Sequence, residues 1–220
     1  MSNKGAVSVK KFHLVLLALF ALCLSPVQAM ADETKDEAYL SAVDRSVKTR
    51  GEVDWRNVRA LYVQSSFYDP YGGAQAIWYA LQRAGQQVVL DPSPENVKAY
   101  KKLLRDHFGH YRSHLQAIDF AKKTASPHID HAFEVKALKG IIETISSTGD
   151  GKTPETAFEV IDPAEEHMIL KAFRYQLKGQ DFRQKGGHYW DVLKYVNPMT
   201  GAEGEMFFNV DIILRSPRRH

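Results

Sequence analysis

The fold is decided by residues 147–158, Ser147-Thr148-Gly149-Asp150-Gly151-Lys152-Thr153-Pro154-Glu155-Thr156-Ala157-Phe158, because apolar residues have helical spacing before this stretch and alternate after it. Its two glycines, its proline and its short polar side chains allow the chain to turn sharply. We name this segment the joint. It predicts an α+β protein, with a helical half over residues 53–147 and a half containing a sheet over residues 148–220.

Before the joint, apolar stripes at spacings of three and four predict a bundle of about five antiparallel helices. The first begins after Asp54 as N-cap and ends near Ser66, and the second ends at Gly85. Ser93-Pro94 opens the third, with a proline in the first turn. The fourth covers residues 111–125, and the most apolar helix, the fifth, opens at Ser126-Pro127.

After the joint, the pattern predicts a small antiparallel sheet with one helix. A strand covers residues 157–161, and Asp162 caps the helix that follows it. A middle strand over residues 176–184 is interrupted by a glycine. The closing hairpin pairs residues 187–196 with residues 205–214 across a turn that contains Asn197-Pro198.

Residues 1–31 have the three parts of a secretory signal peptide. Three lysines precede an apolar run from Leu14 to Leu24, which is too short for a membrane span of about 20 residues. We expect cleavage after Ala31, with a cut after Ala29 as the alternative, and no stable membrane insertion afterwards. The protein would then be periplasmic or secreted, and residues 32–52 would form a flexible segment.

Removal of this leader changes the charge and cysteine content. The chain has 29 Lys and Arg residues, of which Lys4, Lys10 and Lys11 belong to the leader, and this leaves 26 against 26 Asp and Glu residues. A neutral chain gives no reason to expect a nucleic-acid partner. The single cysteine, Cys23, also leaves with the leader, so the mature chain would have no disulfide and no thiol nucleophile.

The chain resembles a family of small exported bacterial proteins classified only as a domain of unknown function. The resemblance covers most of the chain after Val53 and rests on Asp54-Trp55 to Tyr62 and Ser65, Tyr68-Asp69-Pro70-Tyr71, the joint, Val160-Ile161, Glu165-Glu166, Gly187-His188-Tyr189, Asp191-Val192 and Phe208-Asn209-Val210-Asp211. It implies export and a helical half followed by an α+β half. It implies no activity and no catalytic residues.

The closing hairpin holds the candidate catalytic residues. If Asn197 pairs with Ala202, then His188 lies opposite Asp211, and Trp190 lies opposite Asn209 on the same face. A hydrogen-bonded histidine and aspartate could act as a general base, and Asp191 lies nearby in sequence. The sequence offers no recognisable nucleophile motif beside them. A polar network that ties the hairpin to the helices is the alternative interpretation.

Three further groups of residues are candidate ligands. Tyr68 and Tyr71 could line a groove for a peptide or glycan, with Trp78 and Tyr79 beside them, and the alternative is a place in the core. In the joint, Asp150 and Lys152 are either turn residues or surface ligands. Histidines at helical spacing could chelate zinc or copper, namely His110 with His114 and His128 with His131. Because those pairs lie on separate predicted helices, we predict no metal site and no cofactor.

These observations favour an exported α+β protein that binds a protein or peptide partner. The reason is that helical hairpins form concave surfaces, while strong catalytic motifs are missing from the sequence. The alternative is a hydrolase or metal-dependent enzyme that uses the His/Asp site of the hairpin, so the sequence leaves enzymatic activity undecided.

Overall fold

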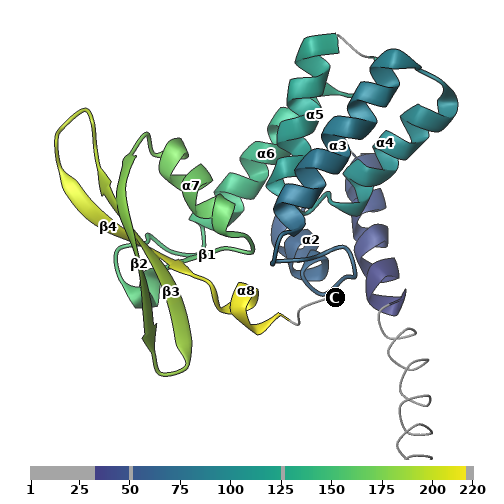
Figure 1. Cartoon of the computed structure of the whole chain (residues 1–220). Coiled ribbons are helices and arrows are strands. Elements are labelled where there is room, and N and C mark those ends of the chain that lie inside the picture. The colour runs from purple at the N-terminus through teal and green to yellow at the C-terminus, as the bar shows by residue number, and fades with distance from the viewer. Residues whose placement is uncertain (1–32, 50–51, 125–126, 217–220) are drawn as a thin grey trace, which may run out of the picture.

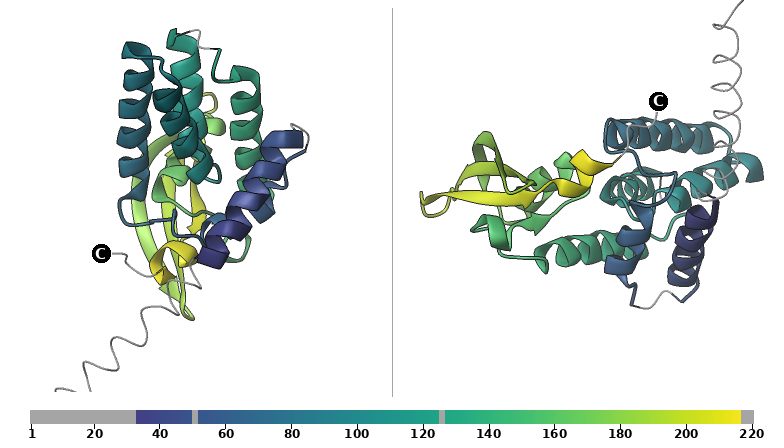
Figure 2. Two further views of the ribbon diagram at one scale, coloured as in Figure 1. Left: turned by 90° about the vertical axis from the view of Figure 1, so that its right-hand side faces the viewer. Right: turned by 90° about the horizontal axis from the view of Figure 1, so that it is seen from below.

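The computed structural model describes residues 33–49, 52–124 and 127–216. The predicted leader and its cleavage site lie outside these residues. The described chain contains eight α-helices and one four-stranded sheet, which confirms the α+β class. The helical half and the sheet lie side by side, with α6 (His131–Ser146) and α7 (Pro163–Ala172) toward the boundary between them (Figures 1 and 2). No helix in the described ranges is long and apolar enough to cross a membrane.

The helical half before α6 contains α2 (Trp55–Tyr62), α3 (Gly73–Leu90), α4 (Pro94–Asp106) and α5 (Tyr111–Thr124). As predicted, Asp54 caps α2 and Ser93 caps α4, where each side chain accepts a main-chain hydrogen bond. Three predicted boundaries are wrong. α2 ends at Tyr62 and not near Ser66, where the Ser65 hydroxyl donates to Tyr62 O. α3 continues past Gly85, because the missing side chain lets Phe120 approach closely. α6 begins after Asp130 and not at Ser126-Pro127, since the Asp130 carboxylate accepts from Phe133 N.

The prediction of a flexible segment over residues 32–52 is wrong for residues 33–49, which are helical. Tyr39, Ala42 and Val43 form a buried stripe on this helix. The Tyr39 hydroxyl accepts a hydrogen bond from Gly109 N at 3.0 Å. On the exposed side, Asp44 forms a two-point ion pair with Arg105 at 2.6 Å. Burial of this short apolar stripe stabilises the helix. The many charged residues around the stripe made the segment resemble a flexible one in the sequence.

The sheet has the strand order β1-β4-β3-β2. Its strands are β1 (Phe158–Glu159), β2 (Gln176–Lys185), β3 (His188–Val196) and β4 (Glu203–Asn209). β1 runs parallel to β4, so the sheet is mixed and the prediction of a purely antiparallel sheet is corrected. The reason is that the chain passes through α7 and two further strands before β4 returns beside β1 in the same direction. β2 has a bulge between Leu177 and Gly179, where an interruption was predicted.

The register of the closing hairpin is the predicted one. Asn197 N donates to Ala202 O at 2.8 Å, and Trp190 lies opposite Asn209. The last strand nevertheless ends at Asn209 and not at Leu214, and a short helix, α8 (Asp211–Arg215), follows. The cause is local, because the Asn209 side chain accepts a hydrogen bond from Asp211 N at 2.9 Å and turns the chain away from the sheet.

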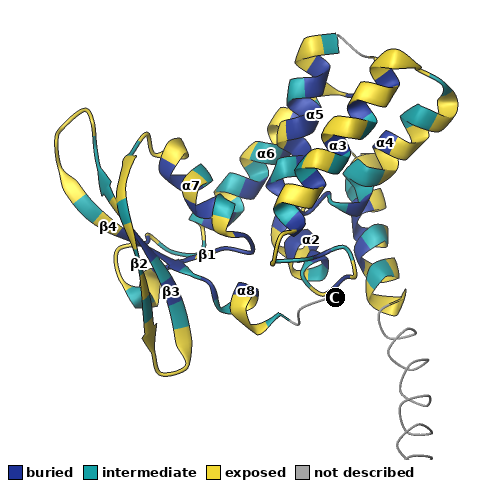
Figure 3. Ribbon diagram, in the orientation of Figure 1, coloured by how far each residue is buried: buried dark blue, intermediate teal, exposed yellow. Residues whose placement is uncertain are grey.

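One hydrophobic core crosses from the helical half into the sheet half (Figure 3). It joins Tyr62 and Ile145 of the helices to Phe158, Ile169 and Phe208 of the sheet half. A second, smaller core lies between α3, α4 and α5. A third cluster covers the opposite face of the sheet, where the 3-10 helix η1 (Pro154–Thr156) receives a hydrogen bond from the Trp190 indole. The sheet is therefore covered on both faces near β1 and β4.

Candidate functional site

Charged side chains are buried where the two halves meet. We name them the junction cluster. Its buried members are Arg59, His110, Asp162, Glu165 and Glu166, and half-buried Asp191 lies beside them. At its centre, the guanidinium of Arg59 from α2 donates to both carboxylate oxygens of Glu165 from α7, at 2.6 and 2.9 Å. Glu165 is fully buried and also accepts from Ile161 N at 3.0 Å. This two-point ion pair fixes α7 against α2.

A second contact of the cluster joins the segment before α5 to the N-terminus of α7. The His110 imidazole lies 3.3 Å from the Asp162 carboxylate, and both side chains are buried. Burial is the largest single influence and acts to raise the pKa of Asp162. The hydrogen bonds from His110 and Ala164 N and the nearby positive charges together outweigh it, so this pKa lies below its ordinary value. Asp162 also accepts from Ala164 N at 2.7 Å and caps α7 as predicted.

The third contact is a pair of acids. Glu166 of α7 is fully buried, and neither of its carboxylate oxygens has a hydrogen-bond donor among the described residues. Burial, first, and the nearby charge of Asp191 on β3 raise the pKa of Glu166 to about 10. Glu166 is therefore a neutral acid at neutral pH. In that form its hydroxyl can donate to the Asp191 carboxylate.

The hairpin holds an exposed polar group on the other face of β3. His188 Nδ1 lies 2.6 Å from Asp211 Oδ2, and the His188 side chain is 56% exposed. Asp211 also accepts from Tyr189 N at 2.8 Å and from Arg215 at 3.2 Å. His188 and Asp211, which the sequence predicted to lie together, are thus in contact. The Asn209 side chain positions Asp211 by accepting a hydrogen bond from Asp211 N.

The structure does not bring all four catalytic candidates together. His188 and Asn209 lie on one face of the sheet, and Asp211 contacts His188 from the start of α8. Successive residues of a strand point to opposite faces, so Asp191 lies on the face toward α7. There it faces Glu166 and not His188. Within the described part of the chain, no hydroxyl is hydrogen-bonded to His188. The hairpin therefore offers a base without an adjacent nucleophile.

The predicted aromatic ligands separate in the structure. Tyr68 is buried, and its hydroxyl donates to Ile161 O at 2.8 Å across the boundary between the two halves. Tyr71 is 40% exposed, and its hydroxyl lies 3.3 Å from Leu214 O at the end of α8. Tyr68 thus occupies the core position that was its alternative interpretation, and it leaves no shared aromatic groove with Tyr79, which is exposed on α3.

Asp150 and Lys152 lie at the surface of the joint and bind each other. Asp150 accepts from Thr156 Oγ1 at 2.6 Å, from Lys152 N at 3.1 Å and from Lys152 Nζ at 3.0 Å. These hydrogen bonds, that from Thr156 first, lower the pKa of Asp150 to about 2. Gly149 is required here, because a Cβ at this position would lie 2.1 Å from Thr156 O. Turn chemistry explains both charged residues.

The histidines do not form a metal centre among the described residues, where no group of three or more potential ligands lies close enough together. His114 contacts Glu134 at 2.6 Å and Phe108 O at 2.7 Å, so both of its ring nitrogens are engaged. Its predicted partner His110 faces Asp162 instead. His131 opens α6, whereas His128 precedes that helix.

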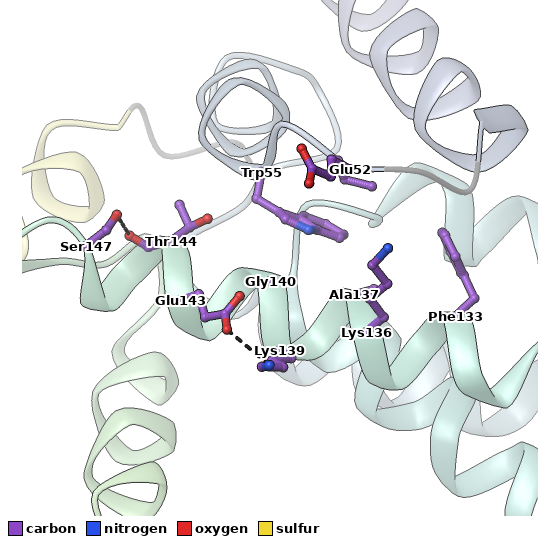
Figure 4. Close-up of a pocket in the computed structure, with 11 residues that line it drawn as sticks. Glu52, Trp55, Phe133, Lys136, Ala137, Lys139, Gly140, Glu143, Thr144 and Ser147 are labelled. Atoms are coloured by element: carbon purple, nitrogen blue, oxygen red, sulfur yellow. Dashed lines mark hydrogen bonds and ion pairs between the residues drawn. The ribbon is translucent and has the colours of Figure 1, made fainter.

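The sequence did not predict the pocket on the helical half. A groove of about 530 Å³ lies between α6 and the chain that enters α2. Trp55 and Phe133 flank it, and Ala137 and Gly140 lie between them on α6 (Figure 4). A Cβ on Gly140 would lie 2.2 Å from the Trp55 indole nitrogen, so this glycine lets the indole lie on the helix. We name this pocket the α6 groove.

The rim of the α6 groove is charged and exposed. Lys136, Lys139 and Glu143 follow one another along α6, and Glu52 lies across from them (Figure 4). Lys139 and Glu143 form an ion pair at 3.4 Å. An apolar floor with a mixed charged rim is the usual composition of a peptide-binding groove. Trp55 was visible in the sequence, but the closeness of Gly140 depends on tertiary packing.

Comparison with known proteins identifies the family of the chain. A family model described as Domain of unknown function (DUF4919) matches residues 30–219. No curated protein and no solved structure matches the chain.

Proposed function

We propose that this chain, which belongs to the family Domain of unknown function (DUF4919), is an exported protein that binds a peptide or protein segment in the α6 groove. The leader pattern over residues 1–31 supports export to the periplasm or the exterior. The observation that supports binding is the groove itself, whose volume of about 530 Å³ lies within the range of ligand sites.

The chemistry of the groove favours an apolar anchor on the ligand. Phe133 is partly buried and stacks on Phe108, with ring centroids 6.1 Å apart. Trp55 stacks on the same Phe108 at 5.0 Å. Both walls thus stack on the same buried ring, which holds them in place, and an apolar side chain of the ligand can pack against them without reorganising the core.

Selection from a random peptide library on the full chain tests this function. We expect enriched peptides that carry an aromatic or aliphatic anchor and whose binding is lost in Phe133→Ala, which removes one wall. The matched control is Phe173→Ala, which removes a 44% exposed phenylalanine beside α7, far along the chain from the groove. Equal loss in both variants, or binding retained in Phe133→Ala, would refute the groove as the site.

A second candidate function rests on the contact of 2.6 Å between His188 and Asp211. A hydrolase would use this pair as its general base and would take its nucleophile from water. Hydrolysis of activated esters by the purified chain, abolished by His188→Ala and by Asp211→Asn without loss of thermal stability, would support it. Hydrolysis that survives His188→Ala would assign the activity elsewhere.

A further inference from the structure

Strand β2 forms an open edge of the sheet. In the order β1-β4-β3-β2 it is the last strand, and in the described chain only β3 pairs with it. With ten residues it is also the longest strand. An edge of this length presents a row of main-chain donors and acceptors that another strand can pair with.

The hydrogen-bond pattern shows which residues face the open side. Val210 N donates to Tyr189 O, so Tyr189 directs its main-chain groups toward β4, and the next residue, Trp190, directs its own toward β2. Trp190 pairs with Arg183, whose main chain therefore faces inward. Its neighbour Phe182 then directs N–H and C=O to the open edge. The same alternation applies two residues away on each side, at Gln180 and Gln184.

The side chains of β2 are complementary to those of a second, antiparallel copy of β2. Phe182 is 57% exposed and stacks on Tyr189, with centroids 6.0 Å apart. Asp181 and Arg183 flank it on the other face of the sheet. If a second β2 pairs antiparallel about a two-fold axis through Phe182, then Asp181 of each copy lies opposite Arg183 of the other. The two phenylalanines face each other, and Gln180 faces Gln184 of the second copy.

The ends of the strand limit the pairing to this segment. The bulge between Leu177 and Gly179 interrupts the ladder on one side, and the turn at Gly186 and Gly187 ends it on the other. Within this length the two copies of Phe182 pair with each other, and Asp181 of each copy pairs with Arg183 of the other. A strand of arbitrary sequence would leave such charges without an opposite charge across from them. A two-fold contact of this kind is the usual basis of a homodimer.

We propose that the open edge of β2 is a self-association surface, on which a second copy of this chain adds its own β2 antiparallel and centred on Phe182. The contact is short, so the dimer forms at high local concentration and exchanges with the monomer. It lies on the sheet half and leaves the α6 groove of each copy accessible.

Cysteine cross-linking tests the proposed register. In a full chain in which Cys23→Ser removes the natural thiol, Phe182→Cys places two thiols across the two-fold axis. The Cα atoms of such a pair lie about 5.5 Å apart, which suits a disulfide. Mild oxidation should therefore give a disulfide-linked dimer. Gln184→Cys is the matched control, because its two copies lie roughly 13 Å apart. Equal cross-linking in both variants, or none in Phe182→Cys, would overturn the proposal.

A charge exchange tests the same contact without a covalent bond. Asp181→Arg and Arg183→Asp each place like charges opposite one another, and we expect several-fold weaker association in sedimentation velocity. The double exchange should restore it. Within one copy, Asp181 contacts Lys194 at 2.7 Å and Arg183 contacts Glu205 at 2.8 Å, so the exchange worsens the internal contacts. Recovery can then come only from the second copy. A double variant as monomeric as the singles, or a wild-type chain that is monomeric at every concentration, would contradict the proposal.

Discussion

The junction cluster and the polar group of the hairpin contain the same kinds of residues on opposite faces of β3, but they differ in burial. In the junction, Glu165 and Glu166 are fully buried, while on the hairpin His188 is 56% exposed. A buried ion pair that loses one partner leaves an uncompensated charge, whereas water solvates the remaining partner of an exposed pair. Accessibility, and not residue type, therefore decides how much each group contributes to stability.

The largest effect is expected from Arg59→Met. This change leaves the carboxylate of Glu165 buried without its cation, which costs about 3 to 5 kcal/mol in the free energy of unfolding. Urea denaturation measures it. Adding Glu165→Gln should recover part of the loss, because the amide oxygen still accepts from Ile161 N and carries no charge. A single variant within about 1 kcal/mol of the wild type would mean that the pair is hydrated.

The effect expected from Glu166→Gln depends on pH. The pKa of Glu166 rises from 4.5 when unfolded to about 10 when folded, so between these values the unfolded chain has lost a proton that the folded chain keeps. Stability contributed by the neutral acid is therefore present in full below pH 4.5 and declines as pH rises, by at most about 1.4 kcal/mol per pH unit.

Glu166→Gln removes this decline, since the amide does not ionise, and the variant should exceed the wild type in stability at pH 8 and above. Denaturation at several pH values measures the two slopes. Glu159→Gln, at an exposed position on β1, is the control and should keep the wild-type slope. Parallel pH profiles for wild type and Glu166→Gln would show that Glu166 is ionised in the folded chain.

The smallest effect is expected from His188→Ala. Asp211 keeps its hydrogen bonds from Tyr189 N and Arg215, and the lost contact is exposed, so the free energy of unfolding should fall by less than about 1 kcal/mol. Thermal and chemical denaturation measure this change. A loss as large as that of Arg59→Met would place the hairpin among the main structural contacts and remove the distinction between the two regions.

The sequence predicted what local chemistry determines. The turn at Asn197 set the hairpin register and with it the contact of His188 with Asp211. Capping residues such as Asp54 and Ser93 marked helix starts. The change to a helix after Asn209 was missed, because an apolar alternation continues through Leu214 while one side-chain hydrogen bond ends the strand.

Contacts between residues far apart in the chain could not be predicted from local sequence patterns. Arg59 lies on the same buried stripe of α2 as Trp55 and Tyr62, and a charge at such a position signals a buried partner. Nothing in the sequence identified that partner as Glu165, which is far along the chain. The pairing of Glu166 with Asp191 and the contact of Gly140 with the indole also depend on how the halves dock.

We propose that the α6 groove, and not the polar hairpin, is the surface that binds. The chain has three tryptophans, with Trp55 at the groove, Trp190 beside His188 on the hairpin and Trp78 on α3. Titration of the full chain with a library-selected peptide, followed through the indole N–H resonances by NMR, separates these regions. We predict that the Trp55 resonance shifts while that of Trp190 stays unchanged. A shift of Trp190 without one of Trp55 would contradict the claim.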